Sequence, residues 1–179
     1  VAPVSFGPIA ADGLEGLLRV GGGKVNFEGG EVLVGPGRVA CEGSLDFAHD
    51  NELALTLRGR DVPLERLAAW GGVPAPVRGR VDFTGRVWGP LAAPGAEAEL
   101  RLRGVSLAGA PFGDGDGRID VASGVVALRD LVVGPFSAGV EVDLVARAAR
   151  IDARLASFGL EAISPPLARL VGGALDCSF

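Results

Sequence analysis

Strict alternation of apolar with charged or polar residues is the feature that most constrains this sequence. It is clearest between residues 79 and 102, where it is interrupted once by the Gly- and Pro-containing segment 88–94. Successive side chains of a β-strand point to opposite faces, so the pattern predicts two strands, each with one apolar and one charged face. The apolar positions are Val81, Phe83, Val87, Ala98, Leu100 and Leu102. This stretch therefore predicts an amphipathic β-hairpin.

The same alternation extends along most of the chain. It predicts strands at 24–28, 31–34, 38–47, 53–60, 79–88, 96–107, 117–121, 125–133, 136–147 and 151–158. We expect helical structure at residues 63–70, where Pro63 occupies the first turn and two glycines follow, and at most two short turns within 160–171. The Gly/Asp-rich segment 113–117 lacks flanking helices, so a hairpin turn is a better interpretation of it than a calcium loop.

Composition excludes several functional classes. The 179 residues are 48% hydrophobic, with 29 Gly and 12 Pro, and the mean hydropathy of +0.36 argues against a disordered Gly/Pro-rich chain. The net charge of −5 comes from interspersed signs, so we expect no nucleic-acid partner. With one His and no Tyr, the chain offers few groups for catalysis near neutral pH, and we expect neither an enzyme nor a cofactor.

Cysteine usage adds little to the functional interpretation. Cys41 and Cys177 have no spacing typical of metal ligands, and both fall in the apolar phase of an expected strand. We therefore expect two small buried residues and no metal site. Whether the two pair as a disulfide depends on the distance between their Cα atoms, which the sequence leaves open.

Three marker segments suggest an internal repeat. Residues 14–17, 64–67 and 160–163 each begin with Leu-Glu and end with Leu or Ile. Each segment precedes a similar strand start, at 23–27, 79–83 and 173–177. Such recurrence is typical of stacked, elongated architectures. We expect one continuous unit over 1–179, with repeat units at about 14–63, 64–159 and a truncated 160–179. The sequence begins without Met and contains no run of roughly 20 apolar residues, so we expect a fragment of a longer chain without a transmembrane segment.

The apolar face of each strand must be shielded from water by another part of the protein or by a ligand. A sandwich or a closed barrel could supply this shielding, but a few short helices could not. A sheet folded along its length into a trough would also shelter the apolar face, and an apolar lining would suit acyl chains. The lining residues that we expect from strand phase, which a one-residue slip would invert, are Val39, Leu45, Leu55, Leu57, Val81, Phe83, Val87, Leu100, Leu102, Ile119, Val121, Val140, Val142 and Leu144.

The order of four segments, 57–67, 79–83, 87–94 and 128–131, resembles the AsmA-like family and especially its TamB branch. These are large bacterial envelope proteins that are anchored in the inner membrane and extend across the periplasm. The resemblance covers about residues 53–147, and the flanks match only as weaker repeats. Pro90 stands where that family typically has Thr in a Gly-Thr-Leu-x-x-Pro turn, a substitution that the turn accommodates.

The resemblance implies a mostly β fold called a β-taco, an elongated U-shaped antiparallel sheet with a hydrophobic groove and short helices between repeat units. It implies a periplasmic location, phospholipid acyl chains as cargo between the two membranes, and an outer-membrane β-barrel assembly protein as a partner. Two alternatives remain open. One is a structural scaffold or chaperone that acts through exposed strand edges, and the other is a secreted adhesin-like β-solenoid with a filled interior.

Overall fold

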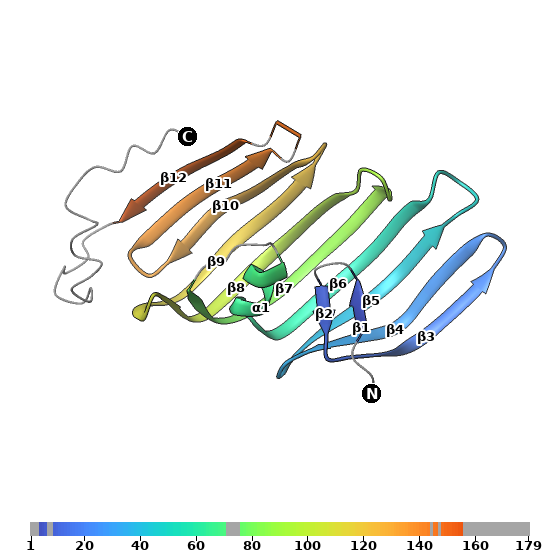
Figure 1. The fold of residues 1–179 in the computed structure, drawn as a ribbon, viewed down its shortest axis with the longest axis horizontal. Helices are drawn as coiled ribbons and strands as arrows, with labels where there is room; N and C mark the ends of the chain where they lie inside the picture. Colours follow the sequence, from blue (N-terminus) through green and yellow to red (C-terminus); the bar gives the residue numbers. More distant parts are fainter. Residues whose placement is uncertain (1–3, 7–8, 71–75, 144, 147, 156–179) are drawn as a thin grey trace.

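The protein is almost entirely β-structure. The computed structural model describes residues 4–6, 9–70, 76–143, 145–146 and 148–155 (Figure 1). Its elements are β1 (Val4–Phe6), β2 (Ile9–Ala11), β3 (Gly13–Gly21), β4 (Lys24–Val34), β5 (Gly37–Asp46), β6 (Glu52–Pro63), α1 (Leu64–Trp70), β7 (Val77–Pro90), β8 (Gly95–Leu107), β9 (Ala110–Ala122), β10 (Val125–Val133), β11 (Phe136–Asp143) and β12 (Ala148–Leu155).

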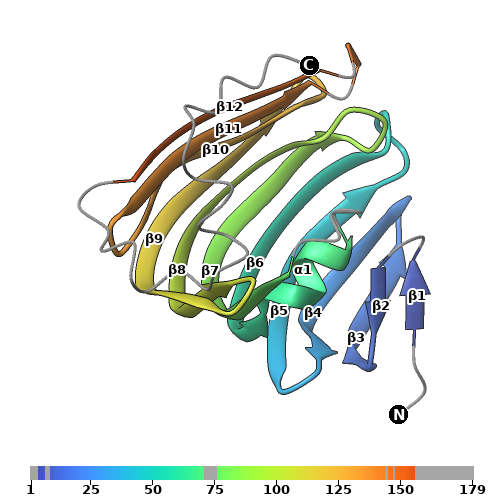
Figure 2. The same cartoon turned by 60° about the vertical axis from the view of Figure 1, so that its left-hand side comes forward.

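Strands β3 to β12 form one open antiparallel sheet of ten strands in sequence order, and β1 and β2 form a separate small hairpin. Each strand of the large sheet therefore pairs with the strands immediately before and after it in the chain. The sheet is a single bent layer (Figure 2). The predicted mostly β class and antiparallel pairing are confirmed.

Helix α1 follows β6 and is the only helix among the described residues. Its seven residues match the helix predicted at 63–70. Pro63 itself belongs to the end of β6, and the helix begins with the next residue. In the described part of the chain, no helix is long and apolar enough to span a membrane.

The predicted break between residues 28 and 31 is wrong. Strand β4 runs through this region without interruption, and its register with β5 shifts between Phe27 and Gly30. Gly29 has a φ of 62°, a left-handed conformation that glycine adopts without a steric penalty. The glycine pair therefore forms a β-bulge inside a long strand instead of a turn between two short ones.

The hairpin turn predicted at 113–117 is also wrong, because these residues lie inside β9. The turn between β8 and β9 is formed by Ala108 and Gly109, which both have positive φ. Within β9, Gly113 has a φ of 94°, and the carboxylate of Asp114 accepts a hydrogen bond of 2.8 Å from the amide of Gly104. The Gly and Asp residues thus lie where the register between β8 and β9 shifts, as at a β-bulge.

The marker segments do not share one structure. Residues 14–17 lie in β3, which the alternation did not predict, whereas residues 64–67 begin α1. The third marker, 160–163, lies outside the described residues, as does the expected helical region 160–171. At the other end of the sheet, β11 ends at Asp143, and residues 145–146 form a turn instead of continuing the strand predicted to 147.

A small hydrophobic core lies where α1 packs on the sheet. Its buried members are Val34, Val62, Val81, Leu102 and Val133, and Leu64 and Leu67 of α1 pack against them. The strand register aligns Val62 with Val81 and Val81 with Leu102, so the core is a row that crosses the strands near one end. The helix therefore covers one end of one face of the sheet.

Candidate functional site

The register brings the predicted lining residues onto one face. Residues that are directly opposite in an antiparallel pair project to the same side, as Leu55 and Val87 do, and Phe83 and Leu100. We call the surface formed in this way the apolar face. Its predicted members are Val39, Leu45, Leu55, Leu57, Val81, Phe83, Val87, Leu100, Leu102, Ile119, Val121, Val140 and Val142. Leu144 lies outside the described residues.

Burial on the apolar face divides it into two parts. Val81 is 1% exposed and Leu102 is 7% exposed, because both lie in the core against which α1 packs. Leu55, Leu57 and Val87 are only partly buried. Val81 and Leu102 are thus structural core residues and not accessible lining. The open part of the face lies toward the other ends of the strands, where no helix of the described chain covers it.

The opposite surface, which we call the charged face, carries ion pairs between neighbouring strands. The guanidinium of Arg86 lies 2.7 Å from Glu97, and that of Arg118 lies 3.2 Å from Glu99. Most of these side chains are about half exposed or more, so each pair contributes little stability on its own. Together these charged side chains make this face of the sheet polar and solvent-exposed, as the alternation predicts.

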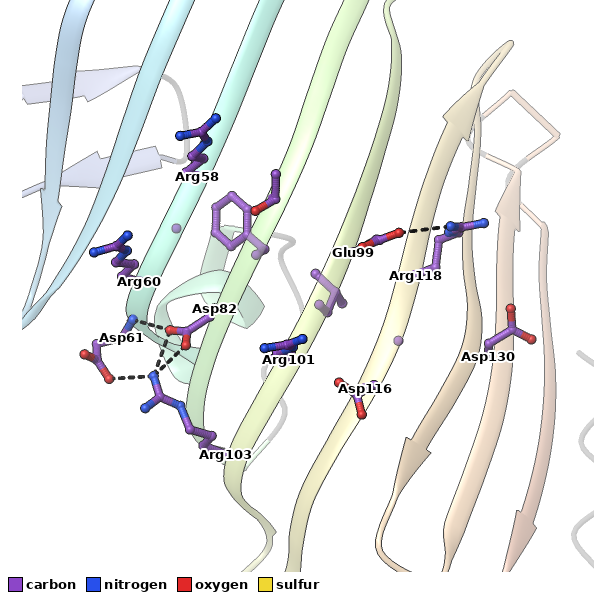
Figure 3. Close-up of a pocket in the computed structure, with 15 residues that line it drawn as sticks. Arg58, Arg60, Asp61, Asp82, Glu99, Arg101, Arg103, Asp116, Arg118 and Asp130 are labelled. Carbon is purple, nitrogen blue, oxygen red and sulfur yellow. Dashed lines mark hydrogen bonds and ion pairs between the residues drawn. The ribbon is translucent and has the colours of Figure 1, made fainter.

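An open pocket of about 940 Å³ lies on this charged face, over strands β6 to β10 (Figure 3). At one end, Arg103 contacts Asp61 at 2.9 Å and Asp82 at 2.8 Å, and the amide of Asp61 donates a 2.8 Å hydrogen bond to Asp82. The charged side chains around the pocket are Arg58, Arg60, Asp61, Asp82, Glu99, Arg101, Arg103, Asp116, Arg118 and Asp130. The alternation predicts charged faces on these strands but does not predict a pocket. The convergence of these side chains depends on strand register, which the alternation alone does not specify.

The turn that follows β5 holds a fully bonded carboxylate. Asp46 is 8% exposed and receives contacts from Lys24 Nζ at 2.9 Å and His49 Nδ1 at 3.1 Å. The amides of Ala48 and His49 donate to its other oxygen. The hydrogen bond from Lys24, followed by those from His49 and Ala48, lowers the pKa of Asp46 from its usual 3.8 to about 2. Residues 47–51 form the turn between β5 and β6, and this cluster holds it closed.

Cys41 is a free thiol in β5, half-buried on the apolar face opposite Leu57. Burial, with a smaller effect from Glu42, raises the pKa of its thiol. Cys177 lies outside the described residues. Among the residues that the structure describes, no group of three or more His, Cys, Asp or Glu side chains could hold a metal ion.

No family model, curated protein or solved structure matches this chain. The likeness to the AsmA-like family therefore remains a resemblance carried by the four sequence segments.

Proposed function

We propose that this chain is a non-enzymatic segment of a periplasmic bridge protein whose apolar face carries phospholipid acyl chains between the inner and outer membranes. The observation that supports this proposal is an apolar face that continues across the ten-stranded sheet and is covered by α1 at only one end in the described chain. The resemblance adds the location, the inner-membrane anchor of the full-length protein and the role in envelope biogenesis.

The dimensions and energetics of the sheet suit such a cargo. Ten strands have nine spacings, and at about 4.8 Å each the apolar face extends roughly 43 Å across the strands. Each methylene group removed from water contributes about 0.8 kcal/mol, so a sheltered acyl chain gains several kcal/mol. Rows such as Leu55, Val87, Val121 and Val142 would contact the chain, and the headgroup would remain at an open edge in water.

The bend of the sheet is consistent with a β-taco groove. Register shifts occur in β4, β6, β8 and β10 at their pairings with neighbouring strands. Such bulges increase local twist and bend a strand, which is how a single antiparallel layer curves toward a trough (Figure 2). In this proposal α1 closes one side of the groove and the acyl chain occupies the uncovered part.

The test is native mass spectrometry with lipid extraction on the 179-residue chain expressed in bacteria. We expect co-purified phospholipid, and we expect Leu55→Asp to reduce it several-fold by placing a charge on the open apolar face. Thr56→Asp is the matched control, because Thr56 is the next residue of β6 and lies on the charged face, opposite Glu42 and Arg86. Leu102 is a poor test position, since a charge there would disrupt the core.

Phospholipid that is depleted by Leu55→Asp and retained by Thr56→Asp would support the proposal and its assigned face. A lipid-free wild-type chain that is folded and monodisperse would contradict it. Equal loss in both variants would also contradict it, because binding would then be independent of the face.

The second candidate is a scaffold or chaperone for outer-membrane protein assembly, and the edge strand β3 favours it. Among the described residues β3 pairs only with β4, and Leu17, Leu18 and Val20 are 52%, 55% and 79% exposed. An exposed edge of this kind can accept a further strand. This function predicts that a strand-forming peptide protects the amides of β3 from hydrogen exchange while no lipid is bound.

A further inference from the structure

Three arginines around the charged-face pocket have no partner in the described part of the chain. Arg58, Arg60 and Arg101 line the pocket, and none of their guanidinium groups makes an ion pair or a hydrogen bond with a described residue. Figure 3 shows Arg58 and Arg60 on β6 at one side and Arg101 on β8 across from them. The other arginines of the pocket differ in this respect, because Arg103 and Arg118 are both paired with carboxylates.

The residues directly opposite the two β6 arginines carry no negative charge. Arg58 is directly opposite Ala40 on β5 and Thr84 on β7, neither of which is charged. Arg60 is directly opposite Arg38, whose guanidinium lies 3.4 Å from the carboxylate of Glu31. Like charges at directly opposite positions of an antiparallel pair destabilise the sheet. At the β6 side of the pocket, the fold thus tolerates repulsion between the guanidinium groups of Arg60 and Arg38.

The carboxylates of the pocket do not compensate for this charge. Asp61 and Asp82 are both engaged by Arg103, and Glu99 is engaged by Arg118. The other two carboxylates lie on β9 and β10, away from β6: Asp116 is directly opposite Arg101, which also has Asp82 opposite it on β7, and Asp130 lies at the far side of the pocket. Its β6 side is therefore cationic, although the pocket as a whole contains equal numbers of arginines and acids.

We infer that this side of the pocket binds a phosphate-type oxyanion, a phosphomonoester or a diphosphate, through the guanidinium groups of Arg58 and Arg60. A guanidinium presents a planar fork of donors that fits phosphate oxygens two at a time. An open pocket lets such an anion enter without rearrangement of the sheet. This site lies on the side of the sheet opposite the apolar face, so it is independent of the proposed acyl-chain binding.

The test is isothermal titration of the 179-residue chain with inorganic diphosphate at low ionic strength. We expect binding that Arg58→Gln/Arg60→Gln weakens on the order of tenfold or more, as for loss of charge-assisted hydrogen bonds. The control is Arg86→Gln, which removes an arginine from the same face but one that is paired with Glu97. The double variant relieves the repulsion with Arg38, so its urea midpoint should equal or exceed that of the wild type.

Flotation with vesicles distinguishes the sources of the phosphate group. The chain is mixed with phosphatidylcholine vesicles that contain or lack phosphatidic acid. Diphosphate binding together with flotation that requires phosphatidic acid, both lost in the double variant, supports the inference with a lipid headgroup as ligand. Diphosphate binding without flotation supports it with a soluble phosphate compound. Absence of diphosphate binding, or an equal loss in Arg86→Gln, would overturn it, since only diffuse electrostatic attraction would remain.

Discussion

Gly115 of β9 occupies a position where neighbouring backbones approach too closely for a side chain. A Cβ atom there would lie 2.0 Å from the carbonyl oxygen of Val132 and 2.8 Å from the Cα of Val133. We predict that Gly115→Ala lowers the free energy of unfolding by roughly 1–3 kcal/mol, because β9 and β10 must separate to accept the methyl group. The measurement is urea denaturation followed by circular dichroism.

The control for this substitution is Gly21→Ala at the end of β3. A Cβ atom at Gly21 would have no neighbour within 4 Å and no unfavourable φ, so we expect a neutral or slightly stabilising effect. If the Gly115→Ala variant were as stable as Gly21→Ala, the backbones of β9 and β10 would have to lie farther apart in solution than in the structure.

Asp46 makes stability depend on pH below 4. Its pKa falls from the usual 3.8 in the unfolded chain to about 2 in the folded protein, mainly through the hydrogen bond from Lys24. A carboxyl group with a depressed folded pKa stabilises the native state above its unfolded pKa, and this contribution is lost as pH falls through the folded value. We predict that the urea midpoint drops between about pH 4 and pH 2 in the wild type.

Asp46→Asn is the comparison, since it keeps the size of the side chain but cannot titrate. Its urea midpoint should be lower than that of the wild type at pH 6 and should change less between pH 4 and pH 2. A parallel decline of both proteins with pH would assign the acid sensitivity to other carboxylates.

At the scale of elements, α1 is fixed to the sheet at two points. Its apolar side places Leu64 and Leu67 against the core row. On its other side, Arg66 contacts the carboxylate of Asp12 at 2.9 Å, and Asp12 also accepts a hydrogen bond from the amide of Gly35. The amide of Gly35 and then Arg66 lower the pKa of Asp12. These contacts link the helix to the segment just before β3.

Removal of the apolar contact should cost more than removal of exposed helix residues. We predict that Leu67→Ala lowers the free energy of unfolding by about 1–3 kcal/mol, toward the low end of buried Leu substitutions because Leu67 is only partly buried. Glu65→Ala, in the same helix but exposed, should stay within about 0.5 kcal/mol of the wild type. Equal effects in urea denaturation would mean that α1 does not cover the core in solution.

At the scale of the whole molecule, Cys41 can report whether the apolar face is occupied. Its thiol is half-buried on that face beside Leu57, and burial already raises its pKa. In a Cys177→Ser background, we predict that added phospholipid slows alkylation of Cys41 several-fold by excluding the reagent. The rate is measured by mass spectrometry under native conditions, with and without lipid.

The matched control is a cysteine placed on the charged face at Thr56 in a background that lacks both natural cysteines (Cys41→Ser, Cys177→Ser, Thr56→Cys). Lipid should leave its alkylation rate unchanged, because Thr56 projects away from the apolar face. Protection of both positions, or of neither, would contradict an acyl chain that lies on the apolar face alone.

The alternation by itself determined that the chain forms amphipathic strands and which residues share a face. The side-chain period of two is a local property, so the members of the apolar face from Val39 to Val142 could be predicted without knowledge of strand pairing. The helix at α1 was likewise predictable, because Pro63 and the glycines after it provide local start and stop signals.

Only the tertiary structure decided how those strands are joined and what each face contains. The segment 113–117 has turn-forming residues, yet pairing with β8 and β10 holds it within a strand, since neighbouring strands satisfy its backbone groups. The packing of α1 made Val81 and Leu102 core residues instead of exposed lining. The register placed Arg60 opposite Arg38 and gathered charges from five strands around one pocket. These outcomes depend on contacts between residues that are distant in the sequence, and a local period carries no information about them.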